Sequence, residues 1–358
     1  MKQIPAKRWL LRLLALVLAI LTLLSAIAYV IDPYFQFRFS APNHYYVNDA
    51  TRFGPGLVMH APYDTLLVGS SMTQNFIVEH LASTLHCEPL RIGIGGIGFV
   101  EINELLQLAY QAGQAKAFYI CVDLPLFSNS SGKMKESRIP GYLSHSDLLS
   151  HLRYLLSFEV WAGYLPVDVG FLLCDKLGIS LPPEIEGKKN IDWMEYWGDQ
   201  FVYGENVVLD VYESSRYDVS DVDTTDLLDR MTHNMDIFFS GLDFTAGQHI
   251  FFFPPYSALF WCNAQDRGYF EEYLEAKEYF IHKALAAGAT VFDFQSDKLS
   301  MDLNNYKDTT HFSPAVNDWE TEQFAESKYL VTEDNREELE QKLRENTERF
   351  RREHKEWF

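Results

Sequence analysis

The stretch Thr65-Leu66-Leu67-Val68-Gly69-Ser70-Ser71-Met72 decides how this chain is expected to fold. Its first four residues form a short hydrophobic run of the kind found in strands that are covered on both faces of a parallel sheet. The Gly-Ser-Ser turn that follows would expose Ser71 at the carboxyl end of this strand. In open α/β sheets, sites lie beyond the carboxyl ends of the strands. The stretch therefore predicts both a fold class and the position of an exposed serine.

The rest of the chain repeats this pattern. Further strands are predicted at Leu90–Ile94, Ala117–Val122, His249–Phe253 and Thr290–Phe294. Helical patterns lie between and after them, at Gln74–His86, Val100–Ala112, Tyr269–Ala287 and Pro314–Glu326. Alternation of strands and helices predicts an α/β fold with a central parallel sheet and helices on both sides.

The amino terminus carries a targeting signal. An apolar run covers Leu13–Ile31 and is long enough to cross a bilayer as one helix. The residues before it include four basic side chains and no acidic one: Lys2, Lys7, Arg8 and Arg12. The positive-inside rule then leaves residues 1–12 in the cytoplasm and the chain after the run outside the cell membrane. Ala26-Ile27-Ala28 resembles a cleavage site, but the length of the run favours an uncleaved single-pass anchor over a signal peptide.

Charge and cysteine content exclude some classes of function. The 358 residues carry a net charge of −20, which argues against nucleic-acid binding because that needs a basic surface. Four cysteines are widely spaced and contain no Cys-x-x-Cys pair: Cys87, Cys121, Cys174 and Cys262. No His/Cys cluster has the spacing of metal ligands, so we expect neither a metal nor a cofactor.

The domain boundaries follow from breaks in the pattern. We expect a linker at 32–63, a domain at 64–330 and a charged, largely solvated helix at 331–358. The strand-helix rhythm stops at about 128–247, with helical stretches near Ser146–Leu156 and Thr224–Phe239. This insertion is either a lid or substrate-recognition segment over the strand ends, or additional packing on the core.

A second motif, Tyr306-Lys307-Asp308-Thr309-Thr310-His311-Phe312-Ser313-Pro314, supplies a histidine with an aspartate three residues before it. A serine nucleophile needs a base, and the base needs a group that fixes its tautomer. The two motifs together predict Ser71 as nucleophile, His311 as base and Asp308 as the orienting carboxylate. The alternatives are that Ser71 caps a helix and that His311 is an ordinary core or surface histidine.

A glycine run, Gly93-Ile94-Gly95-Gly96-Ile97-Gly98, lies between the two motifs. It fits the G-x-G-x-x-G pattern of dinucleotide sites, and Asp123 ends the next strand. However, the run follows the second strand rather than the first, and the anchor places it outside the cytoplasm. These facts favour close approach of the backbone to Ser71, where a second amide could stabilise an oxyanion.

These motifs occur in the order seen in the SGNH (GDSL-like) hydrolase superfamily. The chain most resembles its membrane-anchored, cell-envelope branch, which includes the D-alanyl transfer protein of teichoic-acid modification and alginate O-acetylation proteins. The resemblance covers roughly 64–126 and 250–326. It implies a flavodoxin-like three-layer sandwich after one transmembrane helix, the Ser71–His311–Asp308 triad, and the amides of Ser71 and Gly96 in the oxyanion hole.

Two further features concern substrate contacts. The segment Phe252-Phe253-Pro254-Pro255-Tyr256-Ser257 also resembles the envelope branch, and it would place Tyr256 and Ser257 near substrate. The superfamily usually has an oxyanion-hole asparagine after the third strand, where this chain has Asp123, also expected near substrate. An ionised aspartate cannot donate a hydrogen bond, so Asn75 or Asn129 would have to replace that donor.

The resemblance implies an extracytoplasmic serine acyltransferase or esterase that acts on an acylated cell-envelope polysaccharide or polymer through an acyl-Ser71 intermediate. Its expected partner is a membrane-bound O-acyltransferase. The alternative is a non-catalytic accessory protein of the same fold, which binds glycan or organises a membrane acylation complex.

Overall fold

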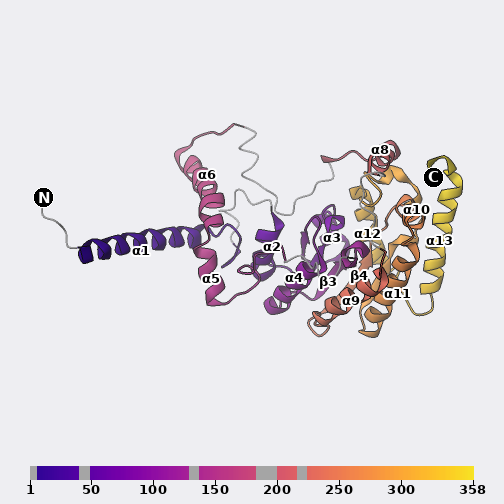
Figure 1. Cartoon of the computed structure of the whole chain (residues 1–358), viewed down its shortest axis with the longest axis horizontal. Helices are drawn as coiled ribbons and strands as arrows, with labels where there is room; N and C mark the ends of the chain where they lie inside the picture. The colour runs from indigo at the N-terminus through magenta and orange to yellow at the C-terminus, as the bar shows by residue number, and fades with distance from the viewer. Residues whose placement is uncertain (1–5, 40–48, 129–136, 183–199, 216–223) are drawn as a thin grey trace. The chain divides into compact units, whose positions relative to one another are not determined.

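Two compact units make up the computed structural model, which describes residues 6–39, 49–128, 137–182, 200–215 and 224–358 (Figure 1). The N-terminal unit consists of the described residues of Met1–Ala61 and Ile139–Trp193. The α/β unit consists of the described residues of Pro62–Arg138 and Met194–Phe358. The segment expected as one insertion at 128–247 therefore contributes to both units.

The N-terminal unit is helical. It contains α1 (Ala6–Ile31), α2 (Ala50–His60), α5 (Leu148–Leu155), a π-helical turn (Val160–Tyr164) and α6 (Leu165–Leu177). Among the described residues, α1 and the segment Leu148–Leu177 are the helices long and apolar enough to cross a membrane. The N-terminal apolar helix expected from the sequence is confirmed, and its being the single span stays a prediction.

The α/β unit is built on a five-stranded parallel sheet with the order β2-β1-β3-β4-β5. Its strands are β1 (Thr65–Gly69), β2 (Pro89–Gly93), β3 (Ala117–Cys121), β4 (Gln248–Phe253) and β5 (Thr290–Asp293). Every predicted strand is present. This order reverses direction between β1 and β3, and in such sheets ligands bind beyond the strand ends at the point of reversal.

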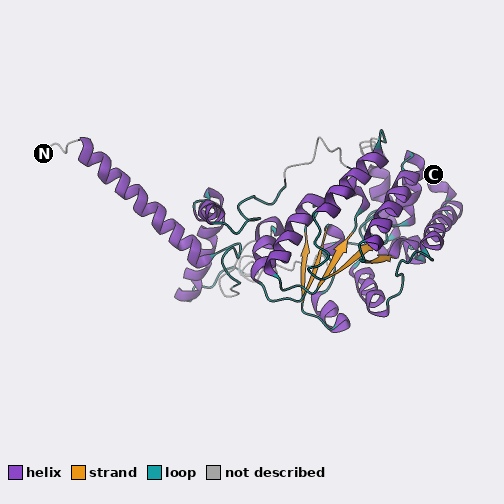
Figure 2. Cartoon of the chain, turned by 90° about the horizontal axis from the view of Figure 1, so that it is seen from below, coloured by secondary structure: helices purple, strands orange, loops and turns teal. Residues whose placement is uncertain are grey.

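Helices cover both faces of this sheet (Figure 2). One face is covered by α3 (Val78–Leu85) and α12 (Pro314–Glu326), which contact each other. The other is covered by α4 (Phe99–Ala112), α9 (Leu227–Ser240) and α11 (Phe270–Ala286). The helices predicted for these stretches are confirmed, although α3 starts later than its pattern because a short turn and a loop precede it.

Alternating phenylalanines on β4 show why the sheet is buried on both faces. Phe251 packs against Phe280 of α11, with ring centroids 5.1 Å apart. Its neighbour Phe252 points to the opposite face and packs against Phe324 of α12 at 5.2 Å. Successive side chains of a strand point to opposite faces, so a continuous apolar run requires a layer of helices on each side.

The described residues of the α/β unit also form α8 (Glu205–Ser215), α10 (Ala258–Arg267) and α13 (Arg336–Glu353). The predicted C-terminal helix is present as α13, but the expectation that it is largely solvated is wrong. Leu339, Leu343 and Phe350 are buried, and α13 packs against α10. A sparse stripe at helical spacing is thus enough to bury one face of an otherwise charged helix.

Candidate active site

Ser71 lies in a tight turn at the carboxyl end of β1. The turn is a 3-10 helix, η2 (Ser71–Thr73), and Ser70 caps it by accepting a hydrogen bond from the N–H of Met72 at 3.3 Å. The capping role considered for Ser71 therefore belongs to Ser70. Close packing fixes the turn, because a Cβ atom on Gly93 of β2 would lie 2.7 Å from Oγ1 of Thr73.

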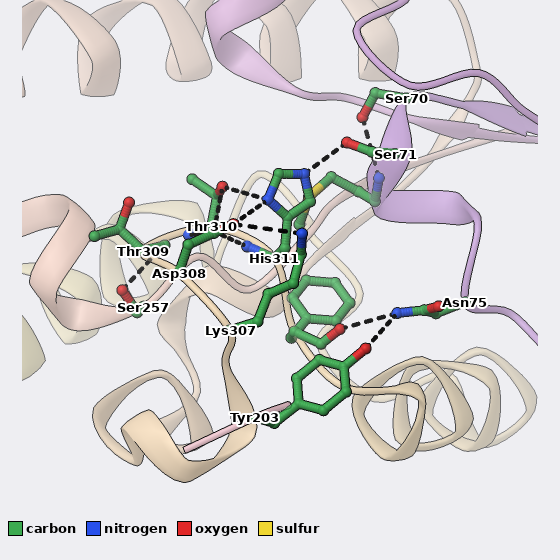
Figure 3. A network of polar contacts seen from close by, with 12 residues as sticks. Ser70, Ser71, Asn75, Tyr203, Ser257, Lys307, Asp308, Thr309, Thr310 and His311 are labelled. Atoms are coloured by element: carbon green, nitrogen blue, oxygen red, sulfur yellow. Dashed lines mark hydrogen bonds and ion pairs between the residues drawn. The ribbon is translucent and has the colours of Figure 1, made fainter. Parts of the chain in front are cut away.

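The predicted serine, histidine and aspartate form one chain of hydrogen bonds (Figure 3). Oγ of Ser71 lies 2.7 Å from Nε2 of His311, and Nδ1 of His311 lies 2.7 Å from Oδ2 of Asp308. An ionised carboxylate only accepts, so Nδ1 carries the proton and Nε2 is free to accept the serine proton. The side chains of His311 and Asp308 are 27% and 22% exposed, so these hydrogen-bonded residues are accessible to solvent.

Asp308 is held as an ionised carboxylate. Its Oδ1 accepts hydrogen bonds from the N–H groups of Thr310 at 2.9 Å and His311 at 2.7 Å. Burial acts to raise the pKa of Asp308, but its hydrogen bonds to His311 and its attraction to that ring in the protonated form lower it to about 2. Asp308 can therefore orient His311 and stabilise an imidazolium at any pH above the acid range.

Ser257 supports the histidine loop from behind. Its hydroxyl donates to the carbonyl oxygen of Thr309 at 2.6 Å, and its backbone N–H donates to the same oxygen at 3.2 Å. The side chain is fully buried, so the prediction that Ser257 contacts substrate is wrong. The physical reason is that Ser257 also caps α10, which fixes it inside the fold.

Asp123 and Tyr256 form a second network beneath the turn. Ser70 donates to Oδ2 of Asp123 at 2.9 Å, and the hydroxyl of Tyr256 donates to Oδ1. Tyr256 is fully buried, so the prediction that it contacts substrate is wrong. Asp123 is half-buried and each of its oxygens accepts one hydrogen bond, so its contact with substrate stays a prediction. Burial raises the pKa of Asp123, and its two hydrogen bonds and the charge that His311 carries when protonated partly oppose this. The network ties the Ser71 turn to the ends of β3 and β4.

We expect Tyr256→Phe to destabilise the protein by about 1 to 3 kcal/mol at neutral pH, because a hydrogen bond to a charged group is lost. Without the tyrosine hydroxyl, the pKa of Asp123 rises further. Ionisation of Asp123 in the folded protein lowers the free energy of unfolding. This destabilisation is absent below the pKa of Asp123 in the unfolded chain and develops as the pH rises through its higher pKa in the folded protein. The destabilisation by Tyr256→Phe should therefore be smaller when free energies of unfolding are measured at pH 4, close to the ordinary aspartate pKa of 3.8, than when they are measured at pH 7.

Tyr306→Phe is the matched control for this comparison. The hydroxyl of Tyr306 is also buried, but it donates to the neutral carbonyl of Pro255 at 2.7 Å. Its loss should be nearly the same at both pH values. An equal loss at both values for Tyr256→Phe would show that the ionisation of Asp123 does not change between pH 4 and pH 7.

Asn75 does not replace the oxyanion-hole asparagine. Its side-chain amide donates to the carbonyl oxygen of Phe312 at 3.1 Å and to the hydroxyl of Tyr203 at 3.4 Å, away from Ser71 (Figure 3). The other candidate, Asn129, lies outside the described residues. Gly96 is exposed in the turn after β2, with a φ of +61° that favours glycine. Backbone amides of Ser71 and Gly96 as oxyanion donors stay predictions.

A buried pair on α12 is a part of the site that sequence reasoning missed. The amide of Asn317 donates to the carbonyl oxygen of Met72 at 3.2 Å and to Oε2 of Glu320 at 2.9 Å. Both side chains are fully buried, and burial raises the pKa of Glu320 well above its ordinary value. The signal was available: the two residues are three apart, on the helix face that carries the buried Val316 and Phe324.

Comparisons with protein-family models and with curated proteins find no match to this chain. Within the described residues, no group of three or more His, Cys, Asp or Glu side chains could hold a metal ion.

Proposed function

We propose that this protein is a serine acyltransferase or esterase that works through an acyl ester on Ser71. One observation carries the proposal: two hydrogen bonds of 2.7 Å link Ser71 to His311 and His311 to Asp308. Nucleophile, base and orienting carboxylate are thus within reach of one another at the carboxyl edge of the sheet. The Asx turn of Asp308 and the support from Ser257 hold the base in this orientation.

The reaction has two halves. In the first, Oγ of Ser71 attacks the acyl carbonyl carbon while Nε2 of His311 takes its proton. The bond to the leaving alcohol then breaks, and His311 returns the proton to that alcohol. In the second half, an acceptor hydroxyl or water gives its proton to His311 and attacks the ester on Ser71. Ser71 leaves with that proton, so the enzyme is regenerated.

The fold supports a relationship to SGNH hydrolases of the cell envelope. The strand order β2-β1-β3-β4-β5 is that of flavodoxin-like sheets, with the serine after β1. The apolar run within α1 follows four basic residues, which favours a cytoplasmic amino terminus and an extracytoplasmic α/β unit. We therefore propose an acylated envelope polysaccharide or polymer as substrate and a membrane-bound O-acyltransferase as partner, on the basis of resemblance.

A fluorophosphonate probe tests the proposal, since it reacts only with an activated serine. The full-length protein should be labelled on Ser71, as located by peptide mass spectrometry, and Ser71→Ala should not be labelled. Ser70→Ala is the matched control: it removes the neighbouring hydroxyl, which caps η2 and contacts Asp123, but keeps the nucleophile. Labelling that persists in Ser71→Ala, or that maps to Ser70, would exclude Ser71 as nucleophile.

One observation favours a non-catalytic accessory protein as the alternative. Asp123 occupies the place of the usual asparagine with both oxygens engaged, and Asn75 donates elsewhere. Loss of one oxyanion donor lowers rates by about a hundredfold to a thousandfold. This alternative expects no probe labelling of the wild type, and full restoration of envelope acylation by Ser71→Ala in a deletion strain. The enzyme proposal expects the opposite result in both experiments.

A further inference from the structure

The helix α5 carries a stripe of exposed leucines. Leu148, Leu149, Leu152 and Leu156 are 76%, 56%, 46% and 46% exposed, and Phe158 just beyond them is 80% exposed. Their spacing places the leucines on one helix face, while Ser150 and Tyr154 on the opposite face are buried. A contiguous apolar surface of this kind marks an interaction site rather than a water-facing one.

The neighbouring helix α1 is suited to lipid along most of its length. It has a mean hydropathy of 2.7, and every residue from Ala6 to Ile20 is exposed in the structure. A helix that is apolar all round belongs in a protein core or a membrane. No core surrounds α1 among the described residues, which leaves the membrane.

Contacts between α1 and α5 begin well before α1 ends. The hydroxyl of Ser25 donates to the carbonyl oxygen of Leu155 at 3.3 Å. The helix α1 contacts α5, the π-helical turn and α6, and its buried or half-buried positions lie between Leu21 and Ile31. Ten residues of helix span about 15 Å, which is half of a hydrocarbon core of about 30 Å. If the anchor ends at Ile31, α5 therefore meets α1 within the depth of the lipid.

The exposed leucines of α5 are also directed toward the side on which the apolar part of α1 lies, as lipid contact requires. The hydroxyl of Tyr154 donates to Oδ1 of Asp32 at 3.0 Å, and its ring packs on Tyr34 at 5.8 Å. Asp32 and Tyr34 follow the end of α1, so the face of α5 that bears Tyr154 is directed toward the residues after α1 and away from the bilayer interior. The leucine face is on the opposite side of α5 and is therefore directed toward the amino-terminal, lipid-embedded part of α1. Figure 1 shows α5 and α6 running across the end of α1, as helices in a membrane surface do.

Residues at the end of α1 have the character of a membrane–water interface. Arg38 donates to the carbonyl oxygens of Tyr29 at 2.8 Å and Val30 at 2.6 Å, and its guanidinium lies over the Tyr29 ring. The indole N–H of Trp161 donates to the carbonyl of Leu155 at 2.7 Å. Tyrosine and tryptophan are enriched at this level of membrane proteins because one part of each ring system is polar.

We propose that the leucine stripe of α5, together with Phe158, is embedded among the phospholipid acyl chains of the leaflet in which α1 ends. The N-terminal unit then contacts the membrane through both α1 and the leucine stripe of α5, and not through α1 alone. The segment Leu148–Leu177 enters the bilayer without crossing it, since its helices are interrupted after Leu155 and lie across α1. This inference does not depend on catalysis by Ser71.

Nitroxide labelling of single cysteines in the full-length protein tests whether the leucine stripe of α5 lies in the membrane. In a background with the half-buried Cys87 and Cys174 replaced by serine, one cysteine is introduced as Leu152→Cys on the stripe. Leu16→Cys in the middle of α1 serves as the lipid control, and Glu337→Cys on α13 as the water control. Each labelled protein is reconstituted in vesicles of phosphatidylcholine and phosphatidylglycerol. Collision of the nitroxide with oxygen and with a nickel chelate is then measured.

The ratio of oxygen to nickel collisions at Leu152 should be close to that at Leu16 and about tenfold above that at Glu337, because hydrocarbon excludes the polar chelate. A Leu152 ratio equal to that of Glu337 would place the stripe in water and overturn the proposal. Protection of Leu152 from both reagents would also overturn it, since it would show a protein partner over the stripe. An oxygen-to-nickel ratio at Leu16 equal to that at Glu337 would show that α1 is not in the membrane, and this would also overturn the proposal.

Discussion

Substitution of His311 by alanine is expected to lower acyl transfer from Ser71 by about four orders of magnitude or more, the scale observed when a triad member is lost. Oγ of Ser71 has its hydrogen bond to Nε2 of this ring, at 2.7 Å. Without the ring, the serine proton has no acceptor and the leaving alcohol has no acid. The measurement is turnover of an activated ester by the purified full-length protein.

The double variant gives the sharper result. Because nucleophile and base act as a unit, Ser71→Ala with His311→Ala should be no slower than the slower single variant. Asp308→Asn should also lose activity, since an amide in place of the carboxylate can hold His311 in the wrong tautomer. Multiplicative losses in the double variant would show that the two residues act independently, which the triad does not allow.

The second large effect concerns a buried ion pair behind the sheet. Nζ of Lys277 on α11 lies 2.7 Å from Oδ2 of Asp293 at the end of β5 and 3.0 Å from Oε1 of Gln295. All three side chains are buried. We expect Asp293→Asn to destabilise the α/β unit by about 3 kcal/mol or more, because it leaves the ammonium group buried without a counter-charge. The asparagine can still accept from the N–H of Gln295, as Asp293 does.

Lys277→Met separates the charge effect from the loss of packing. Combined with Asp293→Asn, it should recover most of the lost stability, because no unpaired charge then remains and methionine preserves the apolar stem. Amide hydrogen exchange of β5 in the full-length protein measures both variants. A double variant as unstable as Asp293→Asn alone would show that the carboxylate matters for its geometry and not for its charge.

The fold was predictable where hydrophobic runs were continuous. Strands such as β1 and β4 contain continuous apolar runs because helices cover both faces, so their limits agreed with the sequence within a residue. The helix α10 was missed, although Ser257 caps it, because its apolar residues have no single-sided periodicity. The partition of 128–247 between two units was out of reach, since it depends on contacts of α5 with α1, far away in the sequence.

The site was predictable in its motifs but not in its support. Local spacing brought Asp308 to His311, and the strand-turn pattern exposed Ser71, so geometry agreed with the sequence there. Tyr256 and Ser257 follow a strand end, and position alone suggested a role in contact with substrate. The structure shows them buried as hydrogen-bond partners of Asp123 and Thr309, a difference that depends on tertiary packing rather than on spacing.

The division of the N-terminal unit has a consequence for truncated forms of the protein. Removing residues 1–61 deletes α1 and α2 but leaves α5 and α6, which pack on α1 in the whole chain. The truncated chain would expose the former contact surface beside the leucines of α5 and would be prone to aggregate. Isolating the α/β unit instead requires a second deletion, in which a polar linker replaces residues 139–193.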